Sequence, residues 1–127
     1  MEKEKRDFIT GQILDASIEV HRHLGPGLLE STYEICLMKE FQLRGIVAER
    51  QLRLPIKYKE YELDQDYRVD ILVEKEYIIE LKAVEIVLPI HHAQIITYLR
   101  LANKRIGFLI NFNEVKLING FRRIIQG

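Results

Sequence analysis

The chain has 127 residues, 47% of them hydrophobic, and its 19 Lys and Arg residues balance 19 Asp and Glu residues. This length and composition predict a single domain spanning residues 1–127 with a substantial hydrophobic core. A net charge of zero excludes any argument from bulk charge for a nucleic-acid partner, although it leaves room for a local basic patch.

The one cysteine, Cys36, excludes an intramolecular disulfide and fits a reducing compartment. The N-terminal stretch MEKEKRDF lacks the apolar core of a signal peptide, and no hydrophobic run approaches the length of a membrane span. We therefore expect a cytoplasmic protein that makes no contact with a membrane.

Two helices are predicted before residue 45. The first spans about residues 6–23 and ends at a Leu-Gly-Pro-Gly segment, and its apolar residues recur at helical spacing: Ile9, Ile13, Ala16 and Val20. The second runs from Leu28 to about Arg44, and Gly45 follows as its stop. Glu30 lies in the first turn of this helix, where its charge interacts favourably with the helix dipole.

A strand-like segment follows the second helix. Residues 52–56 alternate apolar and polar side chains, and Pro55 predicts an edge strand or a bulge. Basic and aromatic residues interleave over residues 57–61. That pattern fits nucleic-acid binding, but it is more often ordinary decoration of an exposed strand.

Residues 67–82 predict two antiparallel strands joined by a tight turn at residues 74–76. If Val73 pairs with Tyr77, one face of the hairpin is wholly apolar and holds Val69, Ile71, Val73, Tyr77, Ile79 and Leu81. The other face carries Arg68, Asp70, Leu72, Ile78, Glu80 and Lys82. In this register Asp70 lies directly opposite Glu80.

The opposed carboxylates of Asp70 and Glu80 need compensation, because like charges directly across a sheet repel each other. A solvated polar face would tolerate the pair. Lys82 supplies one positive charge on the same face, and a hard divalent cation held between the two carboxylates is the more complete solution.

The C-terminal part predicts one more helix and further strands. A helix over residues 90–101 places Gln94 and Tyr98 on one face. The adjacent His91 and His92 point in different directions and lack a partner at zinc-ligand spacing. An apolar strand over residues 105–112 fits a sheet interior, and a short strand over 115–118 turns through an Asn-Gly pair into a last strand over 121–125.

The charges are unevenly distributed along the chain. Residues 60–85 include nine acidic and three basic residues, whereas residues 100–127 include six basic residues and one acidic residue. An acidic metal site beside a basic surface would give this distribution, and so would an ordinary protein with mixed charges. Arg122 and Arg123 would either contact phosphate or protect an edge strand from aggregation.

One motif of the hairpin resembles a known active site. Asp70, then nine residues, Glu80, one residue and Lys82 resemble the active-site hairpin of the PD-(D/E)XK nuclease superfamily. Val69 stands where that superfamily has its leading Pro, which ligates nothing. The spacing is informative only together with its placement on consecutive strands beside an acidic helix.

A second motif lies at the start of the second helix. Gly27, Glu30 and Tyr33 spell G-x-x-E-x-x-Y, which resembles the signature of the GxxExxY protein family, a compact branch of the same superfamily. Matching segments such as R-x-D-I-L, I-E-L-K, a Q-x-x-x-Y helix and G-F-L-I-N-F extend the resemblance over nearly the whole chain. Read from the residues alone, Tyr33 packs in the core, and Gly27 serves a close backbone approach or a turn with positive φ.

The resemblance implies an α/β fold of the restriction-endonuclease-like type, a mixed β-sheet flanked by helices. It also implies a bound Mg²⁺ or Mn²⁺ ion. Asp70 and Glu80 would hold the ion, the backbone carbonyl of Leu81 would add a ligand, and Glu30 would complete the shell directly or through water.

Three further residues receive roles from the same resemblance. Lys82 would position the attacking water and help to deprotonate it. Gln94 would orient the water or the metal shell, and Tyr98 would buttress Gln94 or contact the phosphate. These roles predict catalytic residues on both the hairpin and the helix that follows it.

The predicted reaction is hydrolysis of phosphodiester bonds in nucleic acid, with DNA favoured over RNA. Four basic residues form the predicted pool of phosphate contacts: Arg100, Lys104, Arg122 and Arg123. A homodimer would double this footprint. The alternative is a catalytically idle nucleic-acid-binding or regulatory protein-interaction module that keeps the nuclease fold. The presence of all four charged site residues argues against an idle module: Glu30, Asp70, Glu80 and Lys82. The zero net charge argues in its favour.

Overall fold

The computed structural model describes residues 3–127, so the first two residues of the predicted domain lie outside it. The elements follow in the order α1 (Lys3–Leu24), α2 (Glu30–Leu43), β1 (Ala48–Tyr58), β2 (Tyr61–Val73), β3 (Tyr77–Lys82), α3 (Pro89–Ala102), β4 (Ile106–Asn111), the 3₁₀ helix η1 (Leu117–Gly120) and β5 (Phe121–Ile125). All three predicted helices are confirmed, each within a few residues of its predicted ends.

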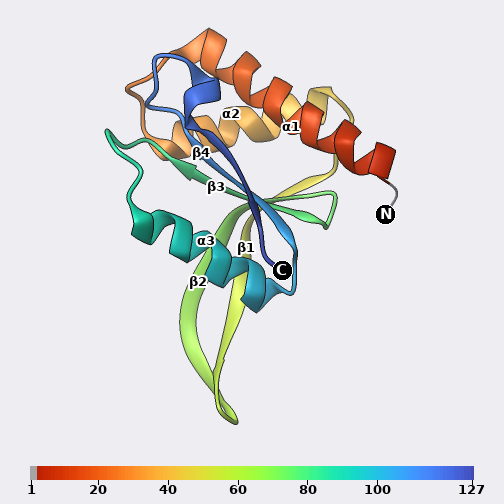
Figure 1. The fold of residues 1–127 in the computed structure, drawn as a ribbon, viewed down its shortest axis with the longest axis vertical. Coiled ribbons are helices and arrows are strands. Elements are labelled where there is room, and N and C mark those ends of the chain that lie inside the picture. Colours follow the sequence, from red (N-terminus) through yellow and green to blue (C-terminus); the bar gives the residue numbers. More distant parts are fainter. Residues whose placement is uncertain (1–2) are drawn as a thin grey trace.

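The strands form one mixed sheet in the order β1-β2-β3-β4-β5. Neighbouring strands are antiparallel except β3 and β4, which run parallel and are joined through α3. Helices α1 and α2 lie against one face of the sheet, and α3 lies against the other (Figure 1). The predicted architecture, a mixed sheet flanked by helices, is therefore confirmed.

Each face of the sheet has its own hydrophobic core. The larger core lies beneath α1 and α2 and includes the predicted stripe of α1 together with Ile71, Ile79 and Leu81. The smaller core lies beneath α3 and joins Leu72 and Ile78 to residues of that helix. Leu72 and Ile78 are buried although they share a face with charged residues, because α3 covers that face.

The predicted register of the β2–β3 hairpin is confirmed. Val73 pairs with Tyr77 and Ile71 with Ile79. The turn uses positive φ at Glu74 and Lys75, 52° and 58°, which lets it close without a glycine. Asp70 directly precedes Ile71 and Glu80 directly follows Ile79, so the register brings these two side by side.

The prediction of one continuous apolar face is wrong at Val69, which packs in the α3 core and not with Ile71. The cause lies across the ladder in β1. Gln51 stands opposite Asp70, and its φ of 57° departs from strand geometry. Because β1 is distorted at this point, strict alternation of faces does not continue through Asp70.

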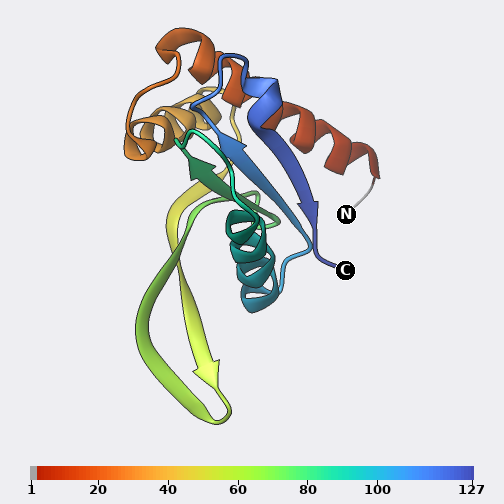
Figure 2. The same cartoon turned by 60° about the vertical axis from the view of Figure 1, so that its left-hand side comes forward.

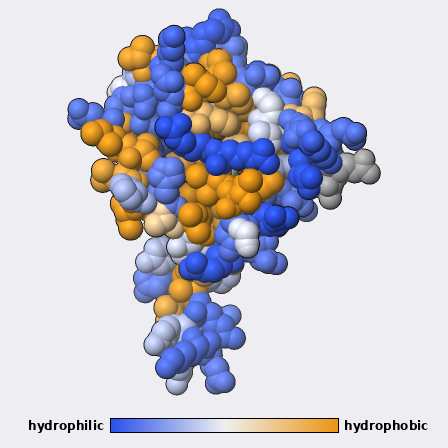
Figure 3. Space-filling model, in the orientation of Figure 1, coloured by the Kyte–Doolittle hydropathy of each residue, from blue (hydrophilic) through white to orange (hydrophobic). Residues whose placement is uncertain are grey.

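Beyond the cores, β1 and β2 continue as a two-stranded arm formed by residues 55–68. Figures 1 and 2 show the arm extending away from the body of the molecule, and its side chains are exposed apart from the half-buried Ile56. The far end of the arm is mainly hydrophilic in Figure 3, whereas apolar side chains gather over the body. Strand β2 begins at residue 61, six residues before its predicted start, because an arm without a buried face needs no apolar alternation.

Tyr33 fixes the connection between α1 and α2. Its ring is fully buried and stacks on Phe112 with 4.5 Å between ring centroids. Its hydroxyl donates to the carbonyl of Gly25 at 2.6 Å and accepts from the backbone N–H of Leu28 at 3.1 Å. The predicted core role of Tyr33 is confirmed. Gly27 has a φ of 98° and open space where a Cβ would lie, so backbone conformation, not close approach, requires a glycine there.

The prediction of a short strand over residues 115–118 is wrong. The segment instead leads into η1, and β5 pairs with β4. A Cβ on Gly120 would lie 2.4 Å from the carbonyl oxygen of Asn111, so η1 packs closely against the end of β4. Strands β1 and β5 form the two edges of the sheet. Pro55, for which an edge strand or a bulge was predicted, lies in edge strand β1 where its register with β2 shifts between Leu54 and Ile56. No helix within residues 3–127 is long and apolar enough to cross a membrane.

Candidate active site

The side chains of Asp70 and Glu80 each accept a hydrogen bond from a backbone N–H of the opposite strand. The backbone N–H of Asp70 donates to Oε1 of Glu80 at 3.2 Å, and the N–H of Leu81 donates to Oδ2 of Asp70 at 2.8 Å. These bonds begin where the regular pairing of Ile71 with Ile79 ends. The carboxylates therefore occupy positions that backbone carbonyls would fill in an undisturbed ladder.

The two carboxyl groups influence each other's ionisation. Burial, and then the charge of Asp70, raise the pKa of Glu80 from its ordinary 4.5 to about 9. Burial also raises the pKa of Asp70, against the lowering effect of the Leu81 N–H. A buried carboxylate beside a half-buried one resists ionisation of both groups unless positive charge is nearby. The hard oxygen donors and the unfavourable like charges fit a divalent cation of the Mg²⁺ type.

Glu30 lies at the first position of α2 and is exposed. Its charge raises the pKa of Asp70, so the two carboxylates are within electrostatic range. Within residues 3–127, however, no three His, Cys, Asp or Glu side chains are arranged to hold a metal ion. Glu30 thus lies within electrostatic range of the carboxyl pair but does not form a three-ligand metal site with it. The predicted third ligand, the carbonyl of Leu81, belongs to a residue whose side chain is buried under α1 and α2.

A chain of polar side chains joins β3 to α3. Nζ of Lys82 donates to Oε1 of Gln94 at 3.4 Å, and Nε2 of Gln94 donates to the hydroxyl of Tyr98 at 3.1 Å. Burial and then the charge of Glu80 raise the pKa of Tyr98, which places this ring near the carboxyl pair. The structure therefore brings together five of the predicted side chains: Asp70, Glu80, Lys82, Gln94 and Tyr98.

A family model of the PD-(D/E)XK nuclease superfamily matches the chain over residues 7–124. The chain belongs to this superfamily. Its five-stranded mixed sheet with three helices agrees with the restriction-endonuclease-like fold that the sequence predicted. The match supports a nuclease-type function, while membership of the GxxExxY branch stays a prediction. No curated protein and no solved structure matched the chain.

The four basic residues predicted to contact substrate do not form one surface of this nuclease fold. Arg122 pairs with Leu109, which also pairs with Glu80, so Arg122 lies in the same row as Glu80 about 10 Å away. Arg123 pairs with Phe108, whose side chain belongs to the opposite core. Lys104 and Arg123 line a cleft near the start of β3, and Arg100 is exposed on α3.

Sequence reasoning missed Glu34, which α2 buries near the carboxyl pair. Its Oε2 accepts from Nε of Arg50 at 2.8 Å, and its Oε1 accepts from Nε2 of Gln51 at 2.8 Å. Glu34 also raises the pKa of Asp70, more than Glu30 does. One signal was present in the sequence, because Glu34 follows Glu30 by one helical turn and shares its face. Its partners on β1 gave no signal.

Proposed function

We propose that the chain is a metal-dependent nuclease that hydrolyses phosphodiester bonds of nucleic acid, with DNA favoured over RNA. The observation that carries this proposal is the Asp70–Glu80 pair, in which Glu80 is buried and Asp70 half-buried, with Lys82 beside it. Like charges close together in a site with little water destabilise the folded state. Such arrangements are therefore found mainly where a function requires them. Membership of the nuclease superfamily supports the same conclusion.

The ion would be Mg²⁺ or Mn²⁺, held by the carboxylates of Asp70 and Glu80 with the carbonyl of Leu81 and, directly or through water, Glu30. When bound, such an ion neutralises charge that develops on the phosphate and on the leaving oxygen. Glu80 must give up its proton before it can serve as a ligand, so metal binding and ionisation of Glu80 are linked.

Lys82 is the group proposed to position the attacking water and to help remove its proton. The amide of Gln94 restrains the ammonium group by accepting its hydrogen bond, and Tyr98 in turn restrains that amide. This arrangement gives α3 a direct part in the site, because it supplies both groups that fix Lys82. Arg122, in the row of Glu80, is the most favourably placed of the predicted phosphate contacts.

Cleavage of single-stranded and double-stranded DNA and of RNA, with Mg²⁺, Mn²⁺ or EDTA, tests the proposal. We expect metal-dependent cleavage by the wild type and a loss of at least about a hundredfold in Asp70→Asn and Lys82→Ala. Glu62→Gln removes an exposed carboxylate from the same strand as Asp70 and should cleave normally. Binding of nucleic acid without cleavage under every condition would favour the catalytically idle module.

A further inference from the structure

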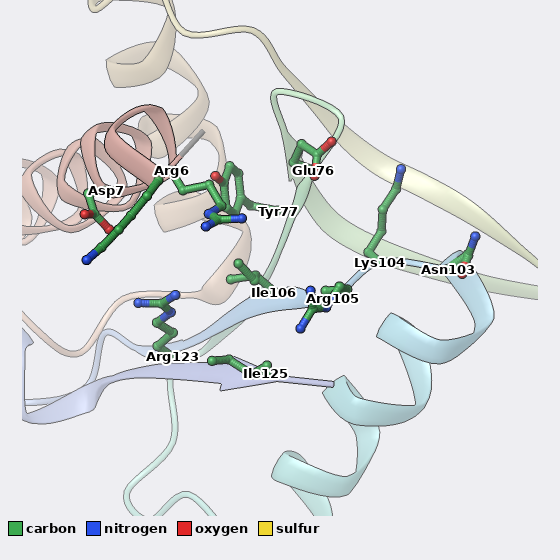
Figure 4. Close-up of a pocket in the computed structure, with 11 residues that line it drawn as sticks. Arg6, Asp7, Glu76, Tyr77, Asn103, Lys104, Arg105, Ile106, Arg123 and Ile125 are labelled. Carbon is green, nitrogen blue, oxygen red and sulfur yellow. The ribbon is translucent and has the colours of Figure 1, made fainter. Parts of the chain in front are cut away.

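A cleft of about 590 Å³ lies on the side of the sheet covered by α1, at the beginning of β3 and β4. Its walls come from α1, the β2–β3 turn, the segment after α3 and strand β5 (Figure 4). The first residue of β3, Tyr77, lines it, and Lys82 at the end of β3 is five residues, or about 16 Å, further along the strand. The cleft is therefore separate from the carboxyl pair.

The cleft is strongly basic. Five of its eleven lining residues are Lys or Arg, and only Asp7 and Glu76 are acidic. This local excess of three positive charges occurs in a chain whose net charge is zero. Its volume falls in the range of sites for small ligands, roughly 300–1,000 Å³.

Three arginines of the cleft have no ion pair with any carboxylate of the part of the chain that the structure describes. Within residues 3–127, Arg6, Arg105 and Arg123 form no side-chain hydrogen bond or ion pair. Five arginines elsewhere in the chain each pair with a carboxylate, namely Arg22, Arg44, Arg50, Arg53 and Arg68. Among residues 3–127, the cleft thus gathers three guanidinium groups that have no hydrogen-bonded side-chain partner.

Arg6 and Arg123 converge on the same space. In Figure 4 the guanidinium group of Arg6 reaches toward Tyr77, and that of Arg123 rises from β5 toward α1. Burial and then Glu76 raise the pKa of Tyr77, and Arg6 and Arg123 both lower it, so the charges of both arginines act on the same residue. Two guanidinium groups that share a cleft repel each other, and a bound anion would remove that repulsion.

We propose that this cleft binds the phosphate groups of a nucleotide, with Arg6 and Arg123 as the principal ligands and Lys104 and Arg105 at its border. The planar fork of a guanidinium matches phosphate oxygens in a bidentate way, and two forks suit a di- or triphosphate. The nucleotide is either free or the 5′-phosphorylated end of a nucleic acid. The site does not depend on the proposed nuclease activity, because its residues are separate from the carboxyl pair.

Calorimetric titration of the full chain in EDTA and low salt tests the site, with ATP and inorganic tripolyphosphate as probes. Arg6→Gln and Arg123→Gln should each weaken binding by about tenfold, the loss expected for a charged hydrogen bond. Lys5→Gln removes one charge from the same turn of α1 outside the cleft and should bind like the wild type. Melting temperatures without ligand verify that each variant folds.

Two further arms separate the sources of phosphate and the two sites. An oligonucleotide with a 5′-phosphate should bind more tightly than its 5′-hydroxyl counterpart if the ligand is a nucleic-acid end, and ATP should bind more tightly than either if it is a free nucleotide. Asp70→Asn should bind the probes unchanged in EDTA, which distinguishes failure of this site from failure of the nuclease proposal.

Three results would overturn the proposal. The first is the absence of heat or stabilisation with either probe at low salt. The second is equal affinity in the wild type, Arg6→Gln and Arg123→Gln. The third is self-association that requires Arg6 and Arg123 and is not displaced by tripolyphosphate, because the cleft would then bind acidic side chains of a second copy.

Discussion

Asp70 and Glu80 are each held by a backbone N–H of the opposite strand, and this exchange fixes their oxygens close together. Burial raises the pKa of both groups, so the metal-free pair retains a proton at neutral pH. A cation that binds between them must displace this proton and also relieves their repulsion. At the scale of single residues, a higher proton affinity of the pair therefore lowers its apparent affinity for the metal ion.

Metal binding can be detected through stability. Mg²⁺ or Mn²⁺ should raise the melting temperature of the wild type, because a ligand that binds only the folded state stabilises it, and Asp70→Asn should abolish the rise. Lys82→Ala should keep the rise, since a lysine repels the ion and the role proposed for Lys82 is on water. Calorimetric melting curves with metal and with EDTA measure both effects. An unchanged metal response in Asp70→Asn would exclude Asp70 as a ligand.

Stability without metal should depend on pH through Glu80. Its pKa is about 9 in the folded chain and about 4.5 when unfolded, so between these values the folded state binds more protons. The free energy of unfolding must then fall as pH rises across this window. In EDTA, Glu80→Gln should therefore gain stability relative to the wild type from pH 5 to pH 9. A constant difference between the two proteins would show that Glu80 is not held protonated.

Among the elements, the β2–β3 hairpin is the part that sequence predicts best. Its apolar residues alternate with period two, and only one register places them all on buried faces, so the pairing of Val73 with Tyr77 followed from the pattern. The same rule failed at Val69, because the distortion at Gln51 belongs to another strand. Alternation within one segment carries no information about an irregularity in its neighbour.

The carboxyl pair was predictable for the same reason, since both members lie on the hairpin. Glu34 was not, because its burial depends on Arg50 and Gln51, which reach it from a strand sixteen or more residues away. The arm was also missed, since its length is set by pairing between two exposed segments and not by a hydrophobic face. Local pattern thus predicted the site's strand residues, and tertiary contacts determined its surroundings.

The link between α1 and α2 gives a test at the scale of elements. Gly27→Ala should destabilise the chain by about 1–2 kcal/mol, because its φ of 98° is unfavourable for a residue with a Cβ. Gly11→Ala is the matched control, since Gly11 lies within α1 with open space around it, and this change should stabilise the chain by roughly 0.5–1 kcal/mol. Urea unfolding measures both. Equal stability in the two variants would mean that positive φ at Gly27 is not required.

For the whole molecule, the distribution of charge matters more than its sum. The predicted basic pool is divided between two places, because Arg122 lies level with Glu80 whereas Lys104 and Arg123 line the separate cleft. A molecule without net charge attracts nucleic acid only weakly from a distance. Under the proposed function, substrate would then be held by a few local phosphate contacts and by the metal.

Salt dependence of binding measures how many phosphate contacts are made. In Ca²⁺, which should support binding without turnover, log affinity against log salt should have a slope of roughly −2 to −3, as two or three contacts predict. Arg122→Gln should reduce the magnitude of this slope by about 1 and weaken binding to all sequences alike. Fluorescence anisotropy with a labelled oligonucleotide provides the measurement. If the slope of Arg122→Gln equals that of the wild type, Arg122 does not contact the backbone.

The arm of residues 55–68 should unfold locally before the rest of the chain does. Its backbone hydrogen bonds are covered by no packed layer of side chains, whereas β3 and β4 are buried between two cores. Amide protons of the arm should therefore exchange with deuterium through local fraying, while those of β3 and β4 wait for global unfolding. A protease could then nick the arm of the folded protein and leave the carboxyl pair intact. The residual cleavage activity of this nicked protein would then show whether the arm contributes to substrate binding.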